Sequence, residues 1–535
     1  MNRTSISLIA AATALAAVTG FASMSAPADA DPTAAGAAAR LPVERTSQLC
    51  PAPSVSDVAE TTYTSVTPTG KGGADSAPAA DAGGTAELRE STVTLADPGG
   101  ADGDKADDEN ADDGKKDDKE GESAQDDAGK GATGEAGKSF MTLKEPGTPV
   151  SAEASGATSP ALVGTATGRF APGWTTQQTT TVTVGGARGL LGMTCTAPDT
   201  DFWFPGASTE RSRQDYVHLT NPDDTVAIVD IELYGADGAV KSETGEGIPV
   251  PAKSSVPVLL STLTSESAPN VTVHVTTRAG RVGAAVRAAD DAGGSDWLTA
   301  SGAPAGSVVL PGIPKDATDV RLVVFATGSA DADLKVQLAT PEGTITPAGL
   351  ESLHVKSQMT AALELADVTK GEAGSLVLSP SGSPAPVVAA LRIVRGKGEK
   401  REIAFIPATA PITARATVAD NRAKGSTLSL TAPGAAAKVR VTSSPGTEGG
   451  EPTVETYDVK ARSTLAVTPK APAGLKGAYA LTVEPESGGP VHASRTLELP
   501  EDGVPMFTVQ TLPDDRGTVS VPRARGDLSI LDDGK

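Results

Sequence analysis

Aromatic residues and histidines are rare in this chain: only 16 of its 535 residues are Phe, Trp or Tyr, and only four are His. No His-Glu-x-x-His pattern and no Gly-x-Ser-x-Gly elbow occurs, so two widespread signatures of zinc peptidases and serine hydrolases are absent. The sequence therefore predicts a protein that is not an enzyme and has no catalytic residues. A hydrolase stays open as an alternative, because a catalytic triad does not require neighbours in sequence.

Long apolar runs are also missing, apart from one at the N-terminus. Arg3 supplies positive charge, Ile6 to Val18 is uncharged and rich in Ala, and Ala28-Asp29-Ala30 offers small residues for cleavage. This order predicts a secretory signal peptide over residues 1–30, because the apolar run is too short to span a bilayer. An uncleaved N-terminal anchor is the alternative. We expect a secreted, extracytoplasmic protein, free or associated with the cell surface, with no transmembrane segment in the mature chain.

Cysteine occurs only twice, at Cys50 and Cys195. Two thiols in an oxidising compartment usually pair. A zinc site would need two further ligands, and no histidine lies near either cysteine in the sequence. The sequence thus predicts a disulfide between Cys50 and Cys195 and no metal site.

Positive charge is in deficit, since the chain carries a net charge of −22. Such a chain repels nucleic acids and anionic membrane surfaces, so neither is expected as a partner. The acidic residues concentrate in residues 101–128, which hold 13 Asp and Glu against 4 Lys. The wider stretch 70–138 has few large apolar residues, which predicts a disordered acidic insert.

Two motif-like segments in this insert fail on residue identity. Segment 131–139 has alanine where a phosphate-binding loop needs its first glycine. Segment 108–119 has aspartate and lysine where a calcium loop needs glycine and glutamate. The sequence therefore predicts no nucleotide and no other cofactor.

An apolar strand that runs into a proline recurs along the chain. Copies end at Pro205, Pro311, Pro407 and Pro513, which are 106, 96 and 106 residues apart, and Pro51 marks an earlier copy. A strand that ends at proline is expected, because proline has no amide donor for the ladder and starts a turn. Short alternating runs between Gly, Pro and Asp turns fill each period and indicate a β-sandwich.

The predicted fold is all-β, with tandem immunoglobulin-like β-sandwich units and a disordered acidic insert. A β-propeller-like closed repeat is the alternative, although propeller blades are typically only about 40–45 residues long. The expected segments are a signal peptide (1–30), a first unit (41–200) interrupted by the insert (70–138), a second unit (201–305), a third unit (306–402), a fourth unit (403–505), and a C-terminal strand and tail (506–535).

Several short motifs resemble an uncharacterised family of exported actinobacterial proteins. They are Leu41-Pro42-Val43-Glu44-Arg45, Leu49-Cys50-Pro51-Ala52-Pro53, Cys195-Thr196-Ala197-Pro198, Trp203-Phe204-Pro205-Gly206 and the stretch from Tyr216 to Gly238. The resemblance covers most of the chain outside the insert. It implies export and a β-rich domain of unknown function, and it brings no catalytic residue, cofactor or substrate.

The aromatic residues between 202 and 297 are the best candidates for recognition. Trp203, Tyr216, Tyr234 and Trp297 have flat faces that can stack on sugars or anchor a protein interface. The competing interpretation is core packing, with Trp203 turned outward or wedged between domains.

Three functions are compatible with these features. The first is a non-catalytic scaffold or interaction protein of the cell envelope or the extracellular space. The second is an envelope glycan-binding protein that uses exposed aromatic residues, and the third is an unrecognised extracellular hydrolase. The expected partners are cell-wall glycan or envelope proteins. Exposed aromatic residues in a groove would favour the second function, and buried ones the first.

Overall fold

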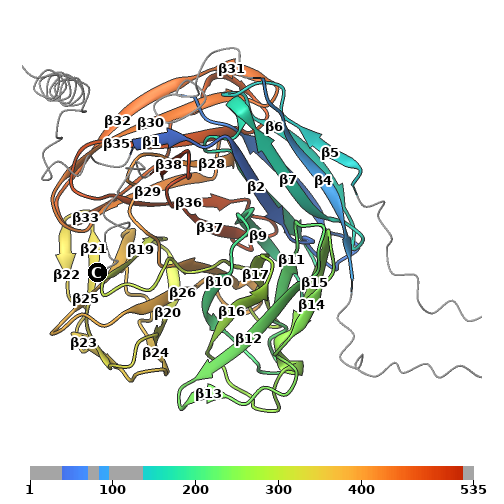
Figure 1. Cartoon of the computed structure of the whole chain (residues 1–535). Helices are drawn as coiled ribbons and strands as arrows, with labels where there is room; N and C mark the ends of the chain where they lie inside the picture. Colours follow the sequence, from blue (N-terminus) through green and yellow to red (C-terminus); the bar gives the residue numbers. More distant parts are fainter. Residues whose placement is uncertain (1–38, 70–82, 95–136, 522–535) are drawn as a thin grey trace, which may run out of the picture. The chain divides into compact units, whose positions relative to one another are not determined.

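The computed structural model describes residues 39–69, 83–94 and 137–521, which form an all-β structure (Figure 1). The described residues contain no α-helix, and three single 3-10 turns lie at Gly168–Phe170, Leu260–Thr262 and Gly398–Lys400. No helix in these ranges is long and apolar enough to cross a membrane. The predicted signal peptide at 1–30 lies outside the described residues.

Most strands belong to four sandwiches of two facing sheets each. The first sandwich contains β2 (Arg45–Cys50), β3 (Glu60–Val66), β4 (Ala86–Val93), β5 (Ser139–Thr142), β6 (Val150–Ser155), β7 (Ala161–Thr167), β8 (Thr175–Val182) and β9 (Gly189–Thr194). The second contains β10 (Asp201–Ala207), β11 (Tyr216–Thr220), β12 (Ala227–Gly235), β13 (Gly238–Val240), β14 (Ile248–Val250), β15 (Ser254–Leu259), β16 (Val271–Ala279), β17 (Gly283–Asp290) and β18 (Gly294–Leu298).

The other two sandwiches follow in the same way. The third contains β19 (Val308–Ile313), β20 (Ala317–Ala326), β21 (Ala332–Thr340), β22 (Gly343–Ile345), β23 (Ser352–Val355), β24 (Thr360–Glu364), β25 (Gly374–Pro380), β26 (Val387–Arg395) and β27 (Glu402–Pro407). The fourth contains β28 (Ala416–Asn421), β29 (Ser426–Ala432), β30 (Ala437–Gly446), β31 (Gly449–Glu451), β32 (Thr453–Val459), β33 (Ser463–Val467), β34 (Ala473–Lys476), β35 (Tyr479–Gly488), β36 (His492–Glu498) and β37 (Phe507–Thr511). Strands β1 (Ala39–Pro42) and β38 (Thr518–Val521) pair only with each other.

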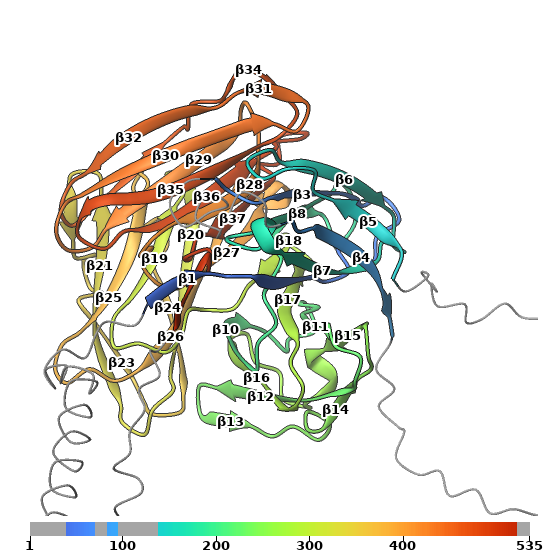
Figure 2. The same ribbon diagram turned by 45° about the horizontal axis from the view of Figure 1, so that its top comes forward.

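All four sandwiches repeat one strand order. The first six of seven main strands alternate between the two sheets and the seventh pairs with the sixth, so that the third sandwich has β19-β25-β21 in one sheet and β24-β20-β26-β27 in the other. The fourth pairs β28-β35-β30 opposite β33-β29-β36-β37, and Figure 2 shows its long strands β30, β32 and β35 side by side. The predicted all-β class built from sandwich units is thereby confirmed.

A continuous sheet joins the first two sandwiches. Strands β4 and β15 pair in parallel, Ser254 with Thr92 and Ser255 with Val93, which produces the order β18-β17-β11-β15-β4-β7-β2. Trp297 from the outer face of this sheet packs with Leu191 and Met193 of β9. The sheet of β6, β3, β8 and β9 therefore also contacts the second sandwich.

The predicted disordered insert at 70–138 is wrong for the segment that forms β4. Alternating residues Ala86 and Leu88 are fully buried, and the strand pairs with β7 over six positions. Ala86 and Leu88 are two residues apart, so both side chains point to the same face of the strand and are buried against the core. Residues 70–82 and 95–136 of the predicted insert lie outside the described residues.

The prolines that end strands occupy two different places. Pro205 and Pro311 lie in β10 and β19, the first strand of a sandwich, while Pro407 ends β27, the last strand of the third. The first and the last strand of a sandwich both lie at a sheet edge, where a residue without an amide donor is tolerated. An apolar strand with a proline can therefore be either the first or the last strand of a sandwich. The expected boundary at 402/403 accordingly falls inside the third sandwich, because β27 pairs with β26. The strand expected within 506–535 is β37, which pairs with β36 and completes the fourth sandwich.

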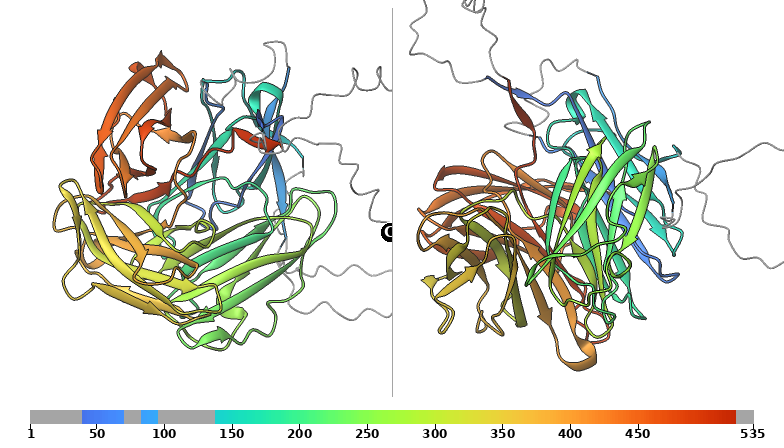
Figure 3. Two further views of the ribbon diagram at one scale, coloured as in Figure 1. Left: turned by 60° about the vertical axis from the view of Figure 1, so that its left-hand side comes forward. Right: turned by 60° about the horizontal axis from the view of Figure 1, so that its bottom comes forward.

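The last strands of the four sandwiches contact one another in a closed cycle, β9 with β18, β18 with β27, β27 with β37, and β37 with β9. We call β9, β18, β27 and β37 the inner strands. Two of them send side chains into the core of the preceding sandwich: Ile403 and Phe405 of β27 enter the core of the second, and Phe507 and Val509 of β37 that of the third. Trp297 of β18 and Leu190 of β9 pack in smaller apolar clusters with the first and the fourth sandwich. Figure 3 shows the second sandwich (green) beside the third (yellow). The inner strands thus join the four sandwiches through two shared cores and two smaller apolar clusters.

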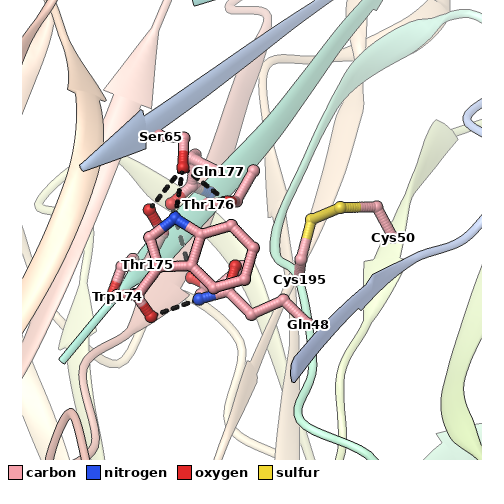
Figure 4. The surroundings of a disulfide bond; sticks show 9 residues. Gln48, Cys50, Ser65, Trp174, Thr175, Thr176, Gln177 and Cys195 are labelled. Atoms are coloured by element: carbon pink, nitrogen blue, oxygen red, sulfur yellow. Dashed lines mark hydrogen bonds between the residues drawn. A yellow bond between two sulfur atoms is a disulfide. The ribbon is translucent and has the colours of Figure 1, made fainter. Parts of the chain in front are cut away.

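The predicted disulfide between Cys50 and Cys195 is present and joins residues 145 positions apart (Figure 4). It connects the end of β2 to the segment that follows β9, inside the core of the first sandwich. Nearby, Trp174 donates its indole hydrogen to Ser65 Oγ at 2.8 Å, and the Gln48 amide donates to the Trp174 carbonyl. The disulfide therefore closes a covalent loop of the chain that contains strands β3 to β9 of the first sandwich.

Replacing both cysteines with serine should lower the free energy of unfolding by about 2–5 kcal/mol, because the open chain regains conformational freedom when unfolded. Urea unfolding followed by intrinsic fluorescence measures this change. The control is wild-type protein unfolded with a reducing agent, which should match the C50S/C195S variant. Equal stability of the oxidised wild type and the variant would contradict the prediction.

Candidate functional site

Trp203 and Tyr234, two of the predicted recognition residues, lie on the outer face of the sheet of β10, β16 and β12. Trp203 faces His274 in the register of β10 and β16, and their rings stack with centroids 3.6 Å apart. Glu232 faces His274 from the other side, in β12. The Tyr234 ring lies 6.4 Å from Trp203. The structure therefore brings these two predicted residues together.

This cluster is also a junction between the second and third sandwiches. The buried Phe325 of β20 lies 5.3 Å from the Trp203 ring and 4.7 Å from the Tyr234 ring. Thr360 of β24 donates to the Tyr234 carbonyl at 2.7 Å. Both predicted residues are half-buried. Trp203 is therefore wedged between domains, as the competing interpretation expected, with part of its surface left open.

Carboxylates border the open part of this cluster. Glu232 Oε2 lies 2.9 Å from His274 Nδ1 and accepts a hydrogen bond from the Tyr234 hydroxyl at 3.1 Å. Asp201 Oδ1 lies 3.5 Å from His274 Nε2. Because the Trp203 ring stacks against His274 and Phe325, the cluster offers an aromatic edge beside carboxylates that can accept hydrogen bonds from sugar hydroxyls. In the described residues the side chain of His274 makes its hydrogen bond to the Glu232 carboxylate, and its buried Nε2 has no hydrogen-bond partner there.

Trp297 and Tyr216, the other two predicted recognition residues, lie between the first and second sandwiches. Trp297 is only 2% exposed and packs edge-on against His218, with centroids 5.2 Å apart. The guanidinium of Arg287 lies over the Tyr216 ring at 5.3 Å. These residues stabilise a junction, and Trp297 offers no face to a ligand.

Two of the histidines, His218 and His492, are buried. Burial, assisted by the neighbouring Arg287, holds the pKa of His218 well below its usual value. Burial lowers the pKa of His492 to about 4, while its Nδ1 lies 2.9 Å from the Thr409 carbonyl oxygen. His354 is exposed, with Nδ1 2.8 Å from Asp333. No group of three or more metal-ligating side chains occurs among the described residues.

Two buried carboxyls lie where the inner strands meet, and the sequence patterns did not indicate them. Asp296 of β18 accepts from the amide of Gly192 in β9 at 3.0 Å and from the Thr508 hydroxyl in β37, also at 3.0 Å. Glu402 of β27 accepts from the amide of Leu190 in β9 at 2.9 Å. Through these contacts Asp296 joins three sandwiches, and Glu402 ties the third to the first.

Burial controls the protonation of both carboxyls. It raises the pKa of Asp296 well above its ordinary range, although the bonds from Gly192 and Thr508 oppose this shift. Burial likewise raises the pKa of Glu402 to about 8, against a smaller opposing effect of its hydrogen bond from Leu190 and of Arg188. Both carboxyls therefore favour the neutral form when the protein is folded.

The sequence carries one weak signal for these residues. Asp296 and Glu402 each fall on an otherwise apolar or small-residue strand, the last of its sandwich, where a charge is unexpected. The partners in β9 and β37 come from residues more than 100 positions away, so no local pattern links them.

We expect the free energy of unfolding of the wild type to fall as the pH rises, and replacing Glu402 with Gln should make this fall smaller. The folded protein holds a proton on Glu402 up to about pH 8, whereas the unfolded chain releases it near pH 4.5. Wild-type stability should therefore fall as pH rises from about 4.5 to 8, by an amount on the order of a few kcal/mol. Urea unfolding at pH 5.5 and pH 9 measures this slope.

The matched control for this measurement is Glu399→Gln, which changes an exposed carboxylate three residues away. E399Q should keep the wild-type slope, and E402Q should be flatter. An identical slope for wild type and E402Q would show that Glu402 is ionised in the folded protein.

Residues 150–470 match the family of unknown function DUF5719. No curated protein and no solved structure gives a match to the chain. The resemblance seen in the sequence is thereby confirmed for a family of unknown function with a β-rich structure. The export and the actinobacterial origin that the resemblance implied stay predictions.

Proposed function

We propose a function from the premise that this chain belongs to the DUF5719 family: it is an exported, non-catalytic scaffold or interaction protein of the cell envelope or the extracellular space. The observation that supports this role is the closed cycle of inner strands, in which the third and fourth sandwiches each complete the core of the sandwich before them. Shared cores of this kind disfavour relative motion of the sandwiches. A rigid body of four sandwiches presents its outer sheets in fixed positions.

The distribution of aromatic residues supports the same role. Trp203, Tyr234 and Trp297, three of the four predicted recognition residues, lie at junctions between sandwiches, and Trp297 is fully enclosed there. Side chains used to join domains contribute to rigidity and are withdrawn from ligands. The unrecognised hydrolase is less well supported: in the described residues the hydrogen bonds of His274, His354 and His492 reach carboxylates or a main-chain oxygen, and neither ring nitrogen of the buried His218 has a hydrogen-bond partner.

Envelope glycan binding is the second candidate, and the open part of the Trp203 cluster favours it. Trp203 and Tyr234 are half-buried, and Glu232 lies beside them as an acceptor. This arrangement offers one aromatic edge and one carboxylate to a sugar. It is smaller than the platform that several stacked sugar rings would need.

If the scaffold role is correct, Trp203→Ala and Tyr234→Ala should leave binding to isolated cell envelopes within about two-fold of wild type, because the binding surface lies elsewhere. Co-sedimentation of the full secreted chain with envelopes and with purified wall polysaccharide measures this retention. Tyr457→Ala is the matched control, since Tyr457 is also half-buried but lies in the fourth sandwich. Loss of polysaccharide retention in folded W203A, with Y457A unchanged, would replace the scaffold role by glycan binding.

Export is tested by where the protein accumulates and by its N-terminus. Expressed from its own first methionine in a secreting bacterial host, the chain should leave the cytoplasm and begin at Asp31, after the Ala28-Asp29-Ala30 pattern. Mass spectrometry of the N-terminal peptide reads this position. An exported protein that still carries residues 1–30 would favour the anchor, and a cytoplasmic protein that begins at Met1 would refute export.

A further inference from the structure

A pocket of about 560 Å³ lies between the second and third sandwiches, away from the Trp203 cluster. Its lining includes the outer faces of β20 and β26, the turn between β17 and β18, and the turn between β26 and β27. A smaller pocket of about 360 Å³ shares Asp290, Gly398 and Arg401 with it and adds Arg188 from the first sandwich. The volume is within the range of small-molecule sites.

The charge of this pocket is opposite to that of the chain. Four cationic side chains line the larger pocket against two carboxylates, in a protein with a net charge of −22. The cations are Arg321, Arg392, Lys397 and Arg401, and the carboxylates are Asp290 and Asp319. A concave surface of one sign concentrates ligands of the other sign.

Two of these arginines face each other directly. Arg321 of β20 and Arg392 of β26 are partners in the antiparallel register. Like charges at facing positions destabilise a sheet. Burial lowers the pKa of Arg392, and the positive charges of Arg213 and Arg321 lower it further. Asp290 and Asp319 raise the pKa of Arg392 but do not offset this lowering. Arg392 forms an ion pair with Asp290, and Arg321 forms one with Glu364.

Several donors around the pocket remain available. The buried Nε of Arg392 has no hydrogen-bond partner in the described part of the chain. Arg401 donates its Nε to the Gly398 carbonyl at 3.1 Å, and neither Arg401 nor Lys397 takes part in an ion pair within the described ranges. Both are exposed at the rim. An anion in the pocket could therefore be bound by these donors without breaking an existing ion pair.

The equivalent place in the second sandwich is closed. Arg287 of β17 faces Trp297 of β18, just as Arg392 of β26 faces Phe405 of β27. Arg287 is 7% exposed and lies against the Tyr216 ring, in a junction covered by the first sandwich. Tyr216 stands where the third sandwich has Arg321. The repeat thus has an aromatic–arginine contact in one copy and two facing arginines beside a pocket in the next.

We propose that this pocket is an anion-binding site that takes the phosphate or carboxylate group of a small molecule or of a polymer end. Guanidinium groups bind both oxyanions through paired hydrogen bonds. Asp290 and Asp319 reject a ligand of dense negative charge and accept hydroxyl donors next to the anionic group. The ligand that fits this lining is a hydroxylated compound with one oxyanion, such as a sugar phosphate or a sugar acid. The site is independent of the scaffold role.

Isothermal titration calorimetry of the full chain at low ionic strength tests the proposal with three probes: glucose 6-phosphate, glucuronate and uncharged glucose. Either anion, or both, should bind at a single site, and glucose should not. Binding of only one anion identifies the group that the site prefers. Replacing Lys397 and Arg401 together with Gln should weaken binding by about ten-fold or more, because two charge-assisted contacts are lost.

The matched control is K438Q/R440Q, which removes the same charge from exposed positions on β30 of the fourth sandwich. This variant should bind within about two-fold of wild type, and thermal melting should confirm that both variants are folded. The proposal is overturned if neither anion binds to the wild type. It is also overturned if K438Q/R440Q weakens binding as much as K397Q/R401Q, since the attraction would then be unspecific.

Discussion

The meeting of the four inner strands is the constraint on which the rest of this structure depends. Asp296 accepts hydrogen bonds from β9 and β37, and Glu402 accepts from β9, so two carboxyls hold strands of all four sandwiches together. An unpaired buried charge would cost several kcal/mol, and the two groups avoid this by favouring the protonated state. Apolar side chains alone would not fix the relative height of four strands. Directional bonds to particular amides do fix it, because only one register satisfies them.

The scarcity of aromatic residues is a further consequence of this design. The third sandwich fills its own core with Val, Leu, Ile and Ala. Some of the larger rings lie where sandwiches meet, namely Trp203 with Phe325, Trp297 with Met193, and Phe405 in the core of the second sandwich. Others, such as Trp174 and Phe204, fill the core of their own sandwich. A large rigid side chain buries much surface at little entropic cost, so a few of them suffice to join domains.

The sequence allowed the fold class and the disulfide to be predicted, because both follow from local signals: alternating short strands for the former and a pair of cysteines for the latter. The sequence did not show whether a strand with a proline is the first or the last of its sandwich, because both are edge strands: Pro205 lies in a first strand and Pro407 in a last one. The strand β4 was missed because Ala86 and Leu88 are a faint apolar signal within a polar stretch. Asp296 and Glu402 could not be predicted, since their partners belong to other sandwiches and no period connects them.

The same reasoning explains why a site would lie at a junction in this protein. The four sandwiches have the same strand order, so residues at equivalent core positions meet similar surroundings. Residues on an outer face that contacts a neighbouring sandwich meet different surroundings in each sandwich. Arg287 and Arg392 occupy one position of the repeat, yet the first is covered by Tyr216 and the first sandwich, and the second borders an open pocket opposite Arg321. Two arginines that face each other would be unfavourable in a purely structural sheet. Arg392 and Arg321 are each paired with one carboxylate, so the positive charge that a ligand would offset is that of Lys397 and Arg401 at the rim of the pocket.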